Sequence, residues 1–213
     1  MSDPWSERAE LYRTSAAHSE GEDLDLIVEW AAGARTALDV ATGGGHVARR
    51  LRDAGLEVVT CDPAPGMRAD VIAFAEDLPF ADGSFDLSVT RVAAHHFADV
   101  RAAARELARV AADRVLVVDN LDMGPDTEEA ERIRDPSHVR NYREDEWRGF
   151  LADVGLAVEE VRILEHPVEL APWLERTGCA GADAARVREL LAGHVADSRI
   201  LFRRIAIRAT KGA

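Results

Sequence analysis

The feature that most constrains this chain is a glycine-rich turn at residues 37–48, which read ALDVATGGGHVA. A short apolar run there ends in a carboxylate, passes through three successive glycines and continues as a helical pattern. Glycine adopts positive φ without a Cβ penalty and lets a ligand approach the backbone closely. The first turn of the following helix directs unpaired N–H groups toward such a ligand. The turn therefore predicts a strand, a ligand-binding corner and a helix; the alternative is a glycine-rich turn that binds nothing.

Two classes of ligand use a corner of this kind, and Asp39 discriminates between them. The residues Gly43, Gly45 and Ala48 satisfy the dinucleotide spelling G-x-G-x-x-G/A. Asp39, however, stands four residues before Gly43, at the expected carboxyl end of the strand. A pyrophosphate there would meet a like charge, whereas a ligand with sulfonium and ammonium groups would be attracted. The carboxylate therefore favours a cationic ligand.

Two separate stretches resemble a known family. Residues 38–45 (LDVATGGG) resemble motif I of the class I methyltransferases that use S-adenosylmethionine, and residues 75–86 (AEDLPFADGSFD) resemble the small-molecule branch of that family, of the type found in ubiquinone and menaquinone biosynthesis. The resemblance runs from about residue 5 to the C-terminus. It implies an α/β, Rossmann-like class I methyltransferase fold, whose seven-stranded, mostly parallel sheet has the order 3-2-1-4-5-7-6, with an antiparallel last strand and helices on both faces.

The resemblance and the spacing of acidic residues together suggest a cofactor site for S-adenosylmethionine. Asp62 lies 17 residues after Gly45, where an acid at the end of the second strand accepts hydrogen bonds from ribose hydroxyls. The alternative is that Asp62 is only a turn or cap residue. A dehydrogenase would also carry an acid at this position, so Asp62 does not discriminate between the two cofactors. By the resemblance, residues 75–77 contact adenine, although many relatives have an acid or small polar residue in place of Phe74. The full expected set is Asp39, Thr42, Gly43, Gly44, Gly45, Asp62, Pro63, Ala75, Glu76, Asp77 and Arg91.

A single domain over residues 1–213 is expected, since this length suits one α/β unit. Strands are predicted at 56–61, 69–74, 85–90, 114–119, 157–164 and 200–209, with helices at 99–112, 144–154, 170–177 and 182–193. By the resemblance, residues 5–31 form a helical cap over the ligand pocket. Residues 120–146 form a long insertion after a strand end, which is expected to line the acceptor pocket; the alternative is a solvated helical excursion.

The sequence offers few candidates for a catalytic base. The pair His95-His96 follows the fourth strand, and an imidazole pKa near 6.5 suits proton transfer at neutral pH. The candidates are His96, His138 and Tyr12, and Tyr12 could share a helix face with Ser15 and His18. A base is needed only if the acceptor is protonated, and the alternative role of the histidine pair is to cap or pack the next helix. No zinc pattern is present, because neither cysteine has a nearby partner, so no metal is expected.

The composition of the chain limits the classes of partner that it is expected to bind. The formal net charge is −13 and Lys211 is the only lysine, which disfavours nucleic acid and anionic membranes, since both depend on basic contacts. Two cysteines imply no disulfide framework. No apolar run approaches the ~20 residues of a membrane span, and the N-terminus does not resemble a signal peptide, so a cytoplasmic location is expected. The sequence does not indicate an oligomeric state.

The predicted function is methyl transfer from S-adenosylmethionine to a small-molecule acceptor by in-line displacement. The resembled branch methylates carbon, oxygen and nitrogen with similar sequences, so the acceptor atom is left open. Two alternatives remain at this point. One is a non-catalytic protein that binds S-adenosylmethionine, and the other is an NAD-dependent oxidoreductase on a similar fold.

Overall fold

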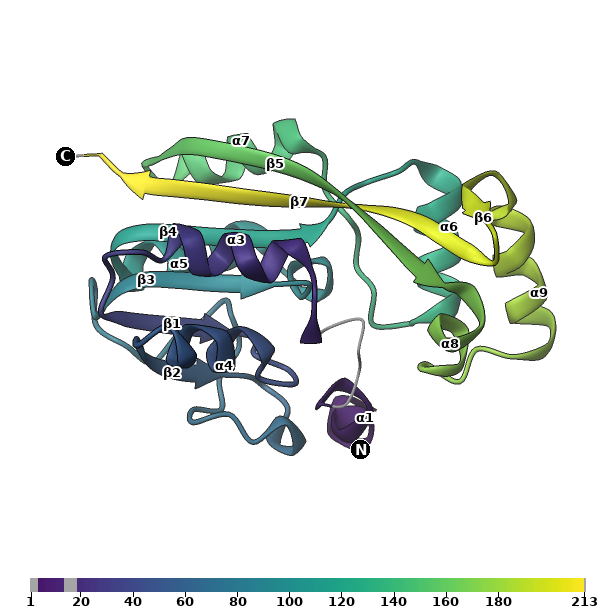
Figure 1. Ribbon diagram of the computed structural model, residues 1–213, viewed down its shortest axis with the longest axis horizontal. Helices are drawn as coiled ribbons and strands as arrows, with labels where there is room; N and C mark the ends of the chain where they lie inside the picture. Colours follow the sequence, from purple (N-terminus) through teal and green to yellow (C-terminus); the bar gives the residue numbers. More distant parts are fainter. Residues whose placement is uncertain (1–3, 14–18, 213) are drawn as a thin grey trace.

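A mixed β-sheet forms the centre of the computed structural model, which describes residues 4–13 and 19–212. In these residues the sheet has seven strands in the order β2-β1-β3-β4-β7-β5, with β6 paired to β7 (Figure 1). Strands β1 to β4 are parallel, and β7 runs antiparallel to both of its long neighbours, which confirms the predicted fold class and strand order. The strands are β1 Thr36–Val40, β2 Glu57–Cys61, β3 Phe85–Arg91, β4 Ala111–Asn120, β5 Leu156–Glu169, β6 Val195–Ala196 and β7 Arg199–Lys211.

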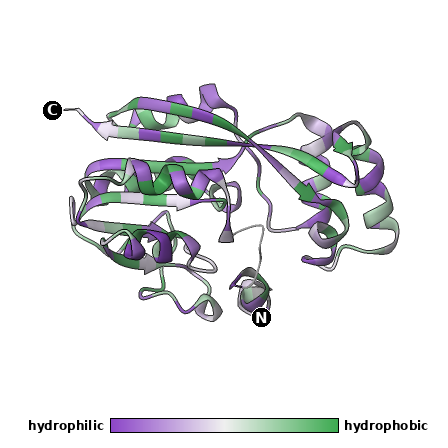
Figure 2. Ribbon diagram, in the orientation of Figure 1, coloured by the Kyte–Doolittle hydropathy of each residue, from purple (hydrophilic) through white to green (hydrophobic). Residues whose placement is uncertain are grey.

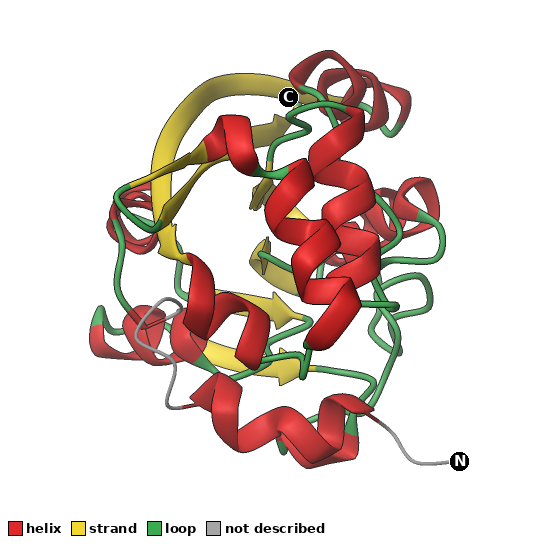
Figure 3. Cartoon of the chain, turned by 90° about the vertical axis from the view of Figure 1, so that its right-hand side faces the viewer, coloured by secondary structure: helices red, strands yellow, loops and turns green. Residues whose placement is uncertain are grey.

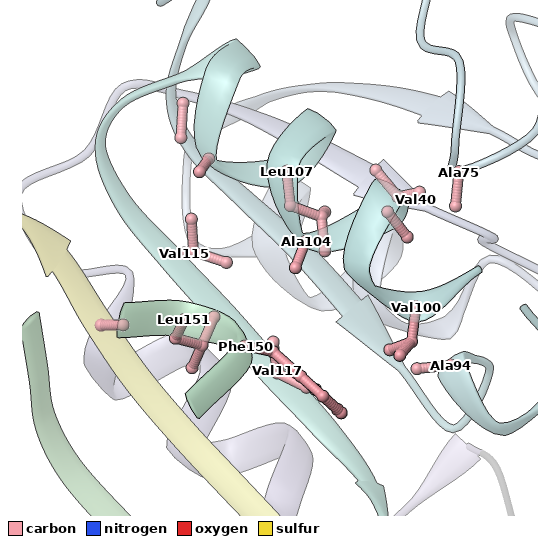
Figure 4. Close-up of a cluster of buried hydrophobic side chains, with 14 of the residues drawn as sticks. Val40, Ala75, Ala94, Val100, Ala104, Leu107, Val115, Val117, Phe150 and Leu151 are labelled. Atoms are coloured by element: carbon pink, nitrogen blue, oxygen red, sulfur yellow. The ribbon is translucent and has the colours of Figure 1, made fainter. Parts of the chain in front are cut away.

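Helices cover both faces of the sheet, because residues of each strand alternate between the faces. Along β4, Val115 and Val117 pack under α5 and α7, whereas Leu116 and Val118 pack under α3 and α4. Figure 4 shows Leu107 of α5 in the first of these two cores. The helices are α1 Pro4–Arg13, α3 Glu22–Trp30, α4 His46–Asp53, α5 Val100–Val110, α6 Pro125–Arg134, α7 Glu144–Asp153, α8 Leu170–Glu175 and α9 Gly181–Leu190, with 3-10 turns η1 Pro65–Met67, η2 Ala94–His96 and η3 Ala192–His194.

The strand predicted at 69–74 is reduced to a single parallel bridge between Cys61 and Val71. It lies beside β2, at the predicted edge of the sheet. The side chain of Asp70 accepts hydrogen bonds from both the backbone N–H and the hydroxyl of Thr60, at 2.9 and 2.7 Å. Such side-chain bonds to the backbone replace the ladder that a regular strand would make. Beyond the bridge the chain leaves the sheet, and Ile72 and Phe74 are exposed.

Strands β5 and β7 continue far beyond the parallel strands as a two-stranded ribbon. Their pairing extends from Leu156 opposite Lys211 to Glu169 opposite Arg199. The sequence predicted that β5 would end before His166 and Pro167, but β5 is an edge strand, where a proline is tolerated because one side of the strand needs no hydrogen-bond donors.

A lobe forms around the far end of this ribbon, and it consists of α6, α8, α9, β6 and the ends of β5 and β7. It has its own hydrophobic cluster, visible as green segments at the right of Figure 2, and Figure 3 views the molecule from this side. Helix α6 comes from the predicted insertion at 120–146. The cluster contains Ala130, Val168, Trp173, Leu174, Val187, Leu191, Ile200 and Phe202.

Helix α1 packs against the turn that follows β2. The backbone N–H of Gly66 donates to the hydroxyl of Ser6 at 2.7 Å, and Arg13 donates to the Gly66 carbonyl at 3.0 Å. A Cβ on Gly66 would lie 2.5 Å from the Cα of Ser6, so only glycine allows this approach. At its N-terminal end α1 also brings Trp5 to His96, with ring centroids 4.6 Å apart. Among the described residues, no helix has the length and apolar character needed to cross a membrane.

We expect Gly66→Ala to detach α1 from the η1 turn. The new methyl group would overlap the Ser6 backbone, and overpacked contacts of this kind cost about 1–3 kcal/mol. Amide hydrogen exchange measured by mass spectrometry should therefore become about tenfold faster, or more, in residues 4–13. The matched control is Gly149→Ala in α7, where a Cβ meets nothing within 4 Å. Unchanged exchange in α1 of the Gly66 variant would contradict this account of the contact.

Candidate functional site

The glycine corner joins β1 to α4 through left-handed backbone. Ala41, Gly43 and Gly45 have φ values of 56°, 51° and 72°, and Gly45 is the N-cap of α4. A Cβ on Gly43 would meet nothing within 4 Å, so the corner presents bare backbone to open space on this side. The carbonyl of Gly44 accepts a hydrogen bond from Arg49 at 2.9 Å. The corner thus has the shape that the sequence predicts for a closely approaching ligand.

Asp39 is buried at the end of β1, directly behind the corner. One carboxylate oxygen accepts hydrogen bonds from the hydroxyl of Thr42 at 2.6 Å and from the backbone N–H of Ala48 at 3.1 Å. Burial raises the pKa of Asp39 to about 6, although these two hydrogen bonds oppose the shift. A cationic ligand close to this carboxylate would favour its ionised form.

Asp62 is buried at the end of β2, the neighbouring parallel strand. Its carboxylate accepts hydrogen bonds from the backbone N–H groups of Gly43 at 3.0 Å and of Ala64 at 2.9 Å. Pro63, between them, is half-buried. The structure therefore brings the predicted residues of the corner and Asp62 together at the carboxyl ends of adjacent strands, where open α/β sheets bind ligands.

Residues 74–77 follow the single bridge at Val71 and have different environments. Ala75 is buried, whereas the side chain of Asp77 is exposed. Glu76 accepts hydrogen bonds from the N–H groups of Ala98 and Asp99 at 2.8 and 3.3 Å, so its carboxylate ties this segment to the chain just before α5. Phe74 is 66% exposed and presents an aromatic ring to solvent.

Arg91, at the end of β3, is buried in a cluster that the sequence did not reveal. Its Nε and Nη2 donate to the two carboxylate oxygens of Asp23 at 2.7 and 3.2 Å, and Arg204 donates to the same carboxylate at 3.0 Å. Burial alone would raise the pKa of Asp23, but the two guanidinium groups outweigh it and hold that pKa below its usual range. Asp23 therefore joins α3 to the end of β3 and to the middle of β7.

Two of the three histidines near the end of β3 are held by acidic side chains. His95 is buried, and its Nδ1 lies 2.6 Å from Asp119. Burial opposes its charged form, but Asp119 outweighs burial and raises the pKa of His95. His138, a sequence candidate for the base, has Glu128 and Glu131 each 3.3 Å from one of its ring nitrogens. Because both nitrogens have carboxylate partners, the geometry gives His138 a structural place in α6 packing rather than a free basic nitrogen.

His96 has the geometry of a neutral proton acceptor. Its Nδ1 lies 3.0 Å from the carbonyl oxygen of Ser137, which can only accept, so Nδ1 carries the hydrogen and Nε2 keeps its lone pair. The hydroxyl of Ser137 donates to Asp135 at 2.6 Å, which agrees with this assignment. Burial, and then the neighbouring His95, lower the pKa of His96 well below 6.5. The side chain of Tyr12, the third candidate, lies outside the described residues, as do Ser15 and His18.

A cavity of about 60 Å³ lies between the ends of β3 and β4 and the lobe. Apolar side chains line one part of it, and a mixed set of histidine, arginine and acidic side chains lines the rest. The apolar residues are Val92, Val168, Trp173 and Phe202; the polar ones are His95, His96, Asn120, Glu131, Arg134, Asp135, His138, His166, Arg176 and Arg204. Within the described part of the chain, no group of three or more His, Cys, Asp or Glu side chains is arranged to hold a metal ion.

Sequence reasoning missed the arginines of this cavity and Asp23, although weak signals were present. Asp23, Ile27 and Trp30 lie at i, i+4 and i+7, so the carboxylate is on the apolar face of α3. Likewise Arg204 continues the buried alternation of Ile200 and Phe202 in β7. A charged residue at an apolar position of a periodic pattern therefore marked both buried groups.

We expect Asp23→Asn to lower the free energy of unfolding at pH 7 by about 3–5 kcal/mol, because two buried guanidinium groups lose their anion. The folded-state pKa of Asp23 is below the ordinary value of 3.8, so its stabilisation is complete above that value and is lost as pH falls through the folded pKa. Urea denaturation should accordingly show the difference from wild type shrinking below pH 4. Asp25→Asn, at an exposed ion pair on the same helix, should cost at most about 1 kcal/mol; equal costs for the two variants would contradict a buried role.

We expect the imidazole of His96 to stay neutral at pH 6 and to hold its proton on Nδ1. Long-range ¹H–¹⁵N correlation spectra, assigned with His96→Gln, report both properties directly. A titration near pH 6.5, or a proton on Nε2, would show that the Ser137 carbonyl does not fix the ring.

Comparison with known proteins places these features in a family. A model of the methyltransferase domain family matches residues 38–118. The uncharacterized methyltransferase YcgJ of Bacillus subtilis is 35% identical over 199 residues, which cover 82% of this chain and 79% of the relative. A demethylmenaquinone methyltransferase of Paenarthrobacter aurescens is 39% identical over 83 residues, 34% of this chain and 33% of that protein.

Solved structures agree. The crystal structure of YcgJ superposes with a TM-score of 0.80 at 27% identity, covering 90% of this chain and 98% of that one. The structure of BH2331 from Bacillus halodurans gives a TM-score of 0.78 at 27% identity, with coverage of 91% and 100%. The similarity therefore includes both the sheet and the lobe.

Proposed function

The chain belongs to the class I S-adenosylmethionine-dependent methyltransferases, and from this membership we propose that it methylates a small molecule held in the cavity beside His96. The membership confirms the family predicted from residues 38–45 and 75–86. The match to a demethylmenaquinone methyltransferase covers only a third of either chain, so the quinone-type branch stays a prediction.

The geometry of the glycine corner supports binding of S-adenosylmethionine, on which the proposal depends. Bare backbone at Gly43 leaves room for close approach, and the buried carboxylate of Asp39 would gain from a neighbouring positive charge. In this proposal Asp62 accepts hydrogen bonds from the ribose hydroxyls. The exposed ring of Phe74 and the backbone of residues 75–77 form the adenine side of the site. In this proposal Arg91 acts on the cofactor site only through Asp23, because its guanidinium is ion-paired with that carboxylate.

The cavity supports the proposed transfer of a methyl group to a small molecule. S-adenosylmethionine, when bound, supplies an electrophilic methyl group whose leaving group is a neutral thioether. The chain's own contribution is alignment of the acceptor and exclusion of water, and positioning of this kind is worth an effective molarity on the order of 10⁵–10⁸ M. Where the acceptor atom carries a proton, His96 is the proposed acceptor of that proton, because it lines the cavity and its Nδ1, not its Nε2, contacts the Ser137 carbonyl.

The observation that carries the proposal is that two features lie next to each other at the carboxyl ends of neighbouring parallel strands. The cofactor corner lies at the ends of β1 and β2, and the cavity with its neutral histidine begins at the ends of β3 and β4. The small volume of the cavity and the acidic composition favour a small acceptor over a nucleic acid. Family membership does not favour the oxidoreductase alternative, and a basic nitrogen at the cavity favours an enzyme over a protein that only binds the cofactor.

We expect isothermal titration calorimetry to show S-adenosylmethionine binding to the wild-type chain and weaker binding to two variants. Asp62→Ala removes the carboxylate proposed for the ribose and should weaken binding about tenfold to a hundredfold. Gly43→Val places a β-branched side chain at φ 51° in the space of the ligand and should abolish binding. Asp53→Ala, an exposed acid at the end of α4, is the control. Unchanged affinity in the first two variants, with folding verified by circular dichroism, would refute the site.

A further inference from the structure

The cavity contains a buried guanidinium with an unused donor. Arg204 is 3% exposed, and its Nη1 donates to Asp23 at 3.0 Å. Its Nε, however, has no hydrogen-bond partner among the described residues. A buried donor without a partner is unfavourable, and more so when the group is charged. The structure therefore retains at Arg204 an unsatisfied charged donor in a residue that lines the cavity.

Arg204 shares its carboxylate partner with a second guanidinium. Asp23 accepts from both Arg91 and Arg204, so it offsets the charge of Arg204 only in part. The neighbouring His166 supplies no anion; burial, and then the charge of Arg204, lower its pKa to about 3, so it is neutral. Asp119, the next carboxylate, lies 2.6 Å from Nδ1 of His95. An anion that enters the cavity would give the Nε of Arg204 the partner that it lacks among the described residues.

Two further arginines line the same cavity from the lobe. Arg134 of α6 stacks over the ring of Trp173 at 4.2 Å and donates to the Trp173 carbonyl at 2.9 Å, and Arg176 follows α8. The two acids in the lining have partners within the protein: Asp135 accepts from Ser137, and Glu131 lies 3.3 Å from His138. In a chain with a net charge of −13, three arginines thus line one small cavity together with these two acids.

We propose that this cavity binds an oxyanion, a carboxylate or a phosphate, carried by the methyl acceptor, with Arg204, Arg134 and Arg176 as its partners. The planar guanidinium fork matches the oxygen pairs of both groups. The cavity has room for a few water molecules, which is the size of such a group, while Trp173 and Phe202 provide an apolar wall for the rest of the acceptor. The inference rests on the proposed function, because it assigns the acceptor to that site. None of the corner residues Asp39, Thr42–Gly45 or Asp62 lines the cavity.

The test uses the full chain saturated with S-adenosylhomocysteine, whose binding is measured first by calorimetry. Benzoate, phenyl phosphate and the neutral benzamide are then titrated into this complex and followed by NMR. At least one of the two anions should bind, at least tenfold more tightly than benzamide, and the stronger of the two identifies the oxyanion. Arg204→Gln and Arg176→Gln should each weaken anion binding about tenfold or more, as expected for loss of a charged hydrogen bond. Arg132→Gln, an exposed arginine on α6 outside the cavity, should leave it unchanged.

Each outcome separates the inference from the function on which it rests. If S-adenosylhomocysteine does not bind, the proposed function fails together with the site. If it binds but neither anion does, or if benzamide binds as well as benzoate, the oxyanion inference fails and the function stands. Competition between the anion and S-adenosylhomocysteine would place the anion in the cofactor site and would also overturn the inference. Arg176→Gln decides the matter if Arg204→Gln does not fold, since Arg176 makes no contact with Asp23.

Discussion

The carboxylate of Asp23, shared between Arg91 and Arg204, is the interaction on which the arrangement of the site depends. Its partners lie 68 and 181 residues away in the sequence, so it joins helix α3 to a central strand and to the C-terminal strand. Arg204 pairs with Asn120, the last residue of β4, and beyond this point the ribbon of β5 and β7 leaves the sheet. The ion cluster therefore fixes the point from which the lobe projects, and the cavity opens between the lobe and the strand ends.

The two halves of the site are built in different ways. The proposed cofactor corner consists of backbone N–H groups and two carboxylates within residues 39–64, so neighbouring residues in the sequence form it almost alone. The proposed acceptor cavity takes side chains from η2, α6, β5, α8 and β7, which only the folded chain brings together. The methyltransferase family model matches residues 38–118, which include the corner and stop before the lobe. Most of the cavity lining lies beyond that shared region, although Val92, His95 and His96 lie within it.

This difference also decides how much the sequence could predict. The corner and the two carboxylates follow from local spacing and the strand order from the family resemblance, and the structure has them in the predicted places. Residues 69–74 read as a strand, but Asp70 bonds locally to Thr60 and limits the pairing to a bridge. Pro167 reads as a strand end, but β5 lies at a sheet edge, which only the pairing with β7 determines. Arg204 and Asp23 acquire their roles from contacts across almost the whole chain, and periodicity marks only that each is buried.

The proposed oxyanion site and the candidate base are coupled by charge. His96 is kept neutral by burial and by its neighbour His95, whose own charged form Asp119 stabilises. The protein's own groups therefore disfavour a proton on His96. An acceptor anion bound at Arg204 would add a negative charge to the same cavity and so raise the pKa of His96. The imidazole would then be the better proton acceptor when the acceptor is in place, because the charge that positions the acceptor also stabilises the imidazolium formed when its proton is removed.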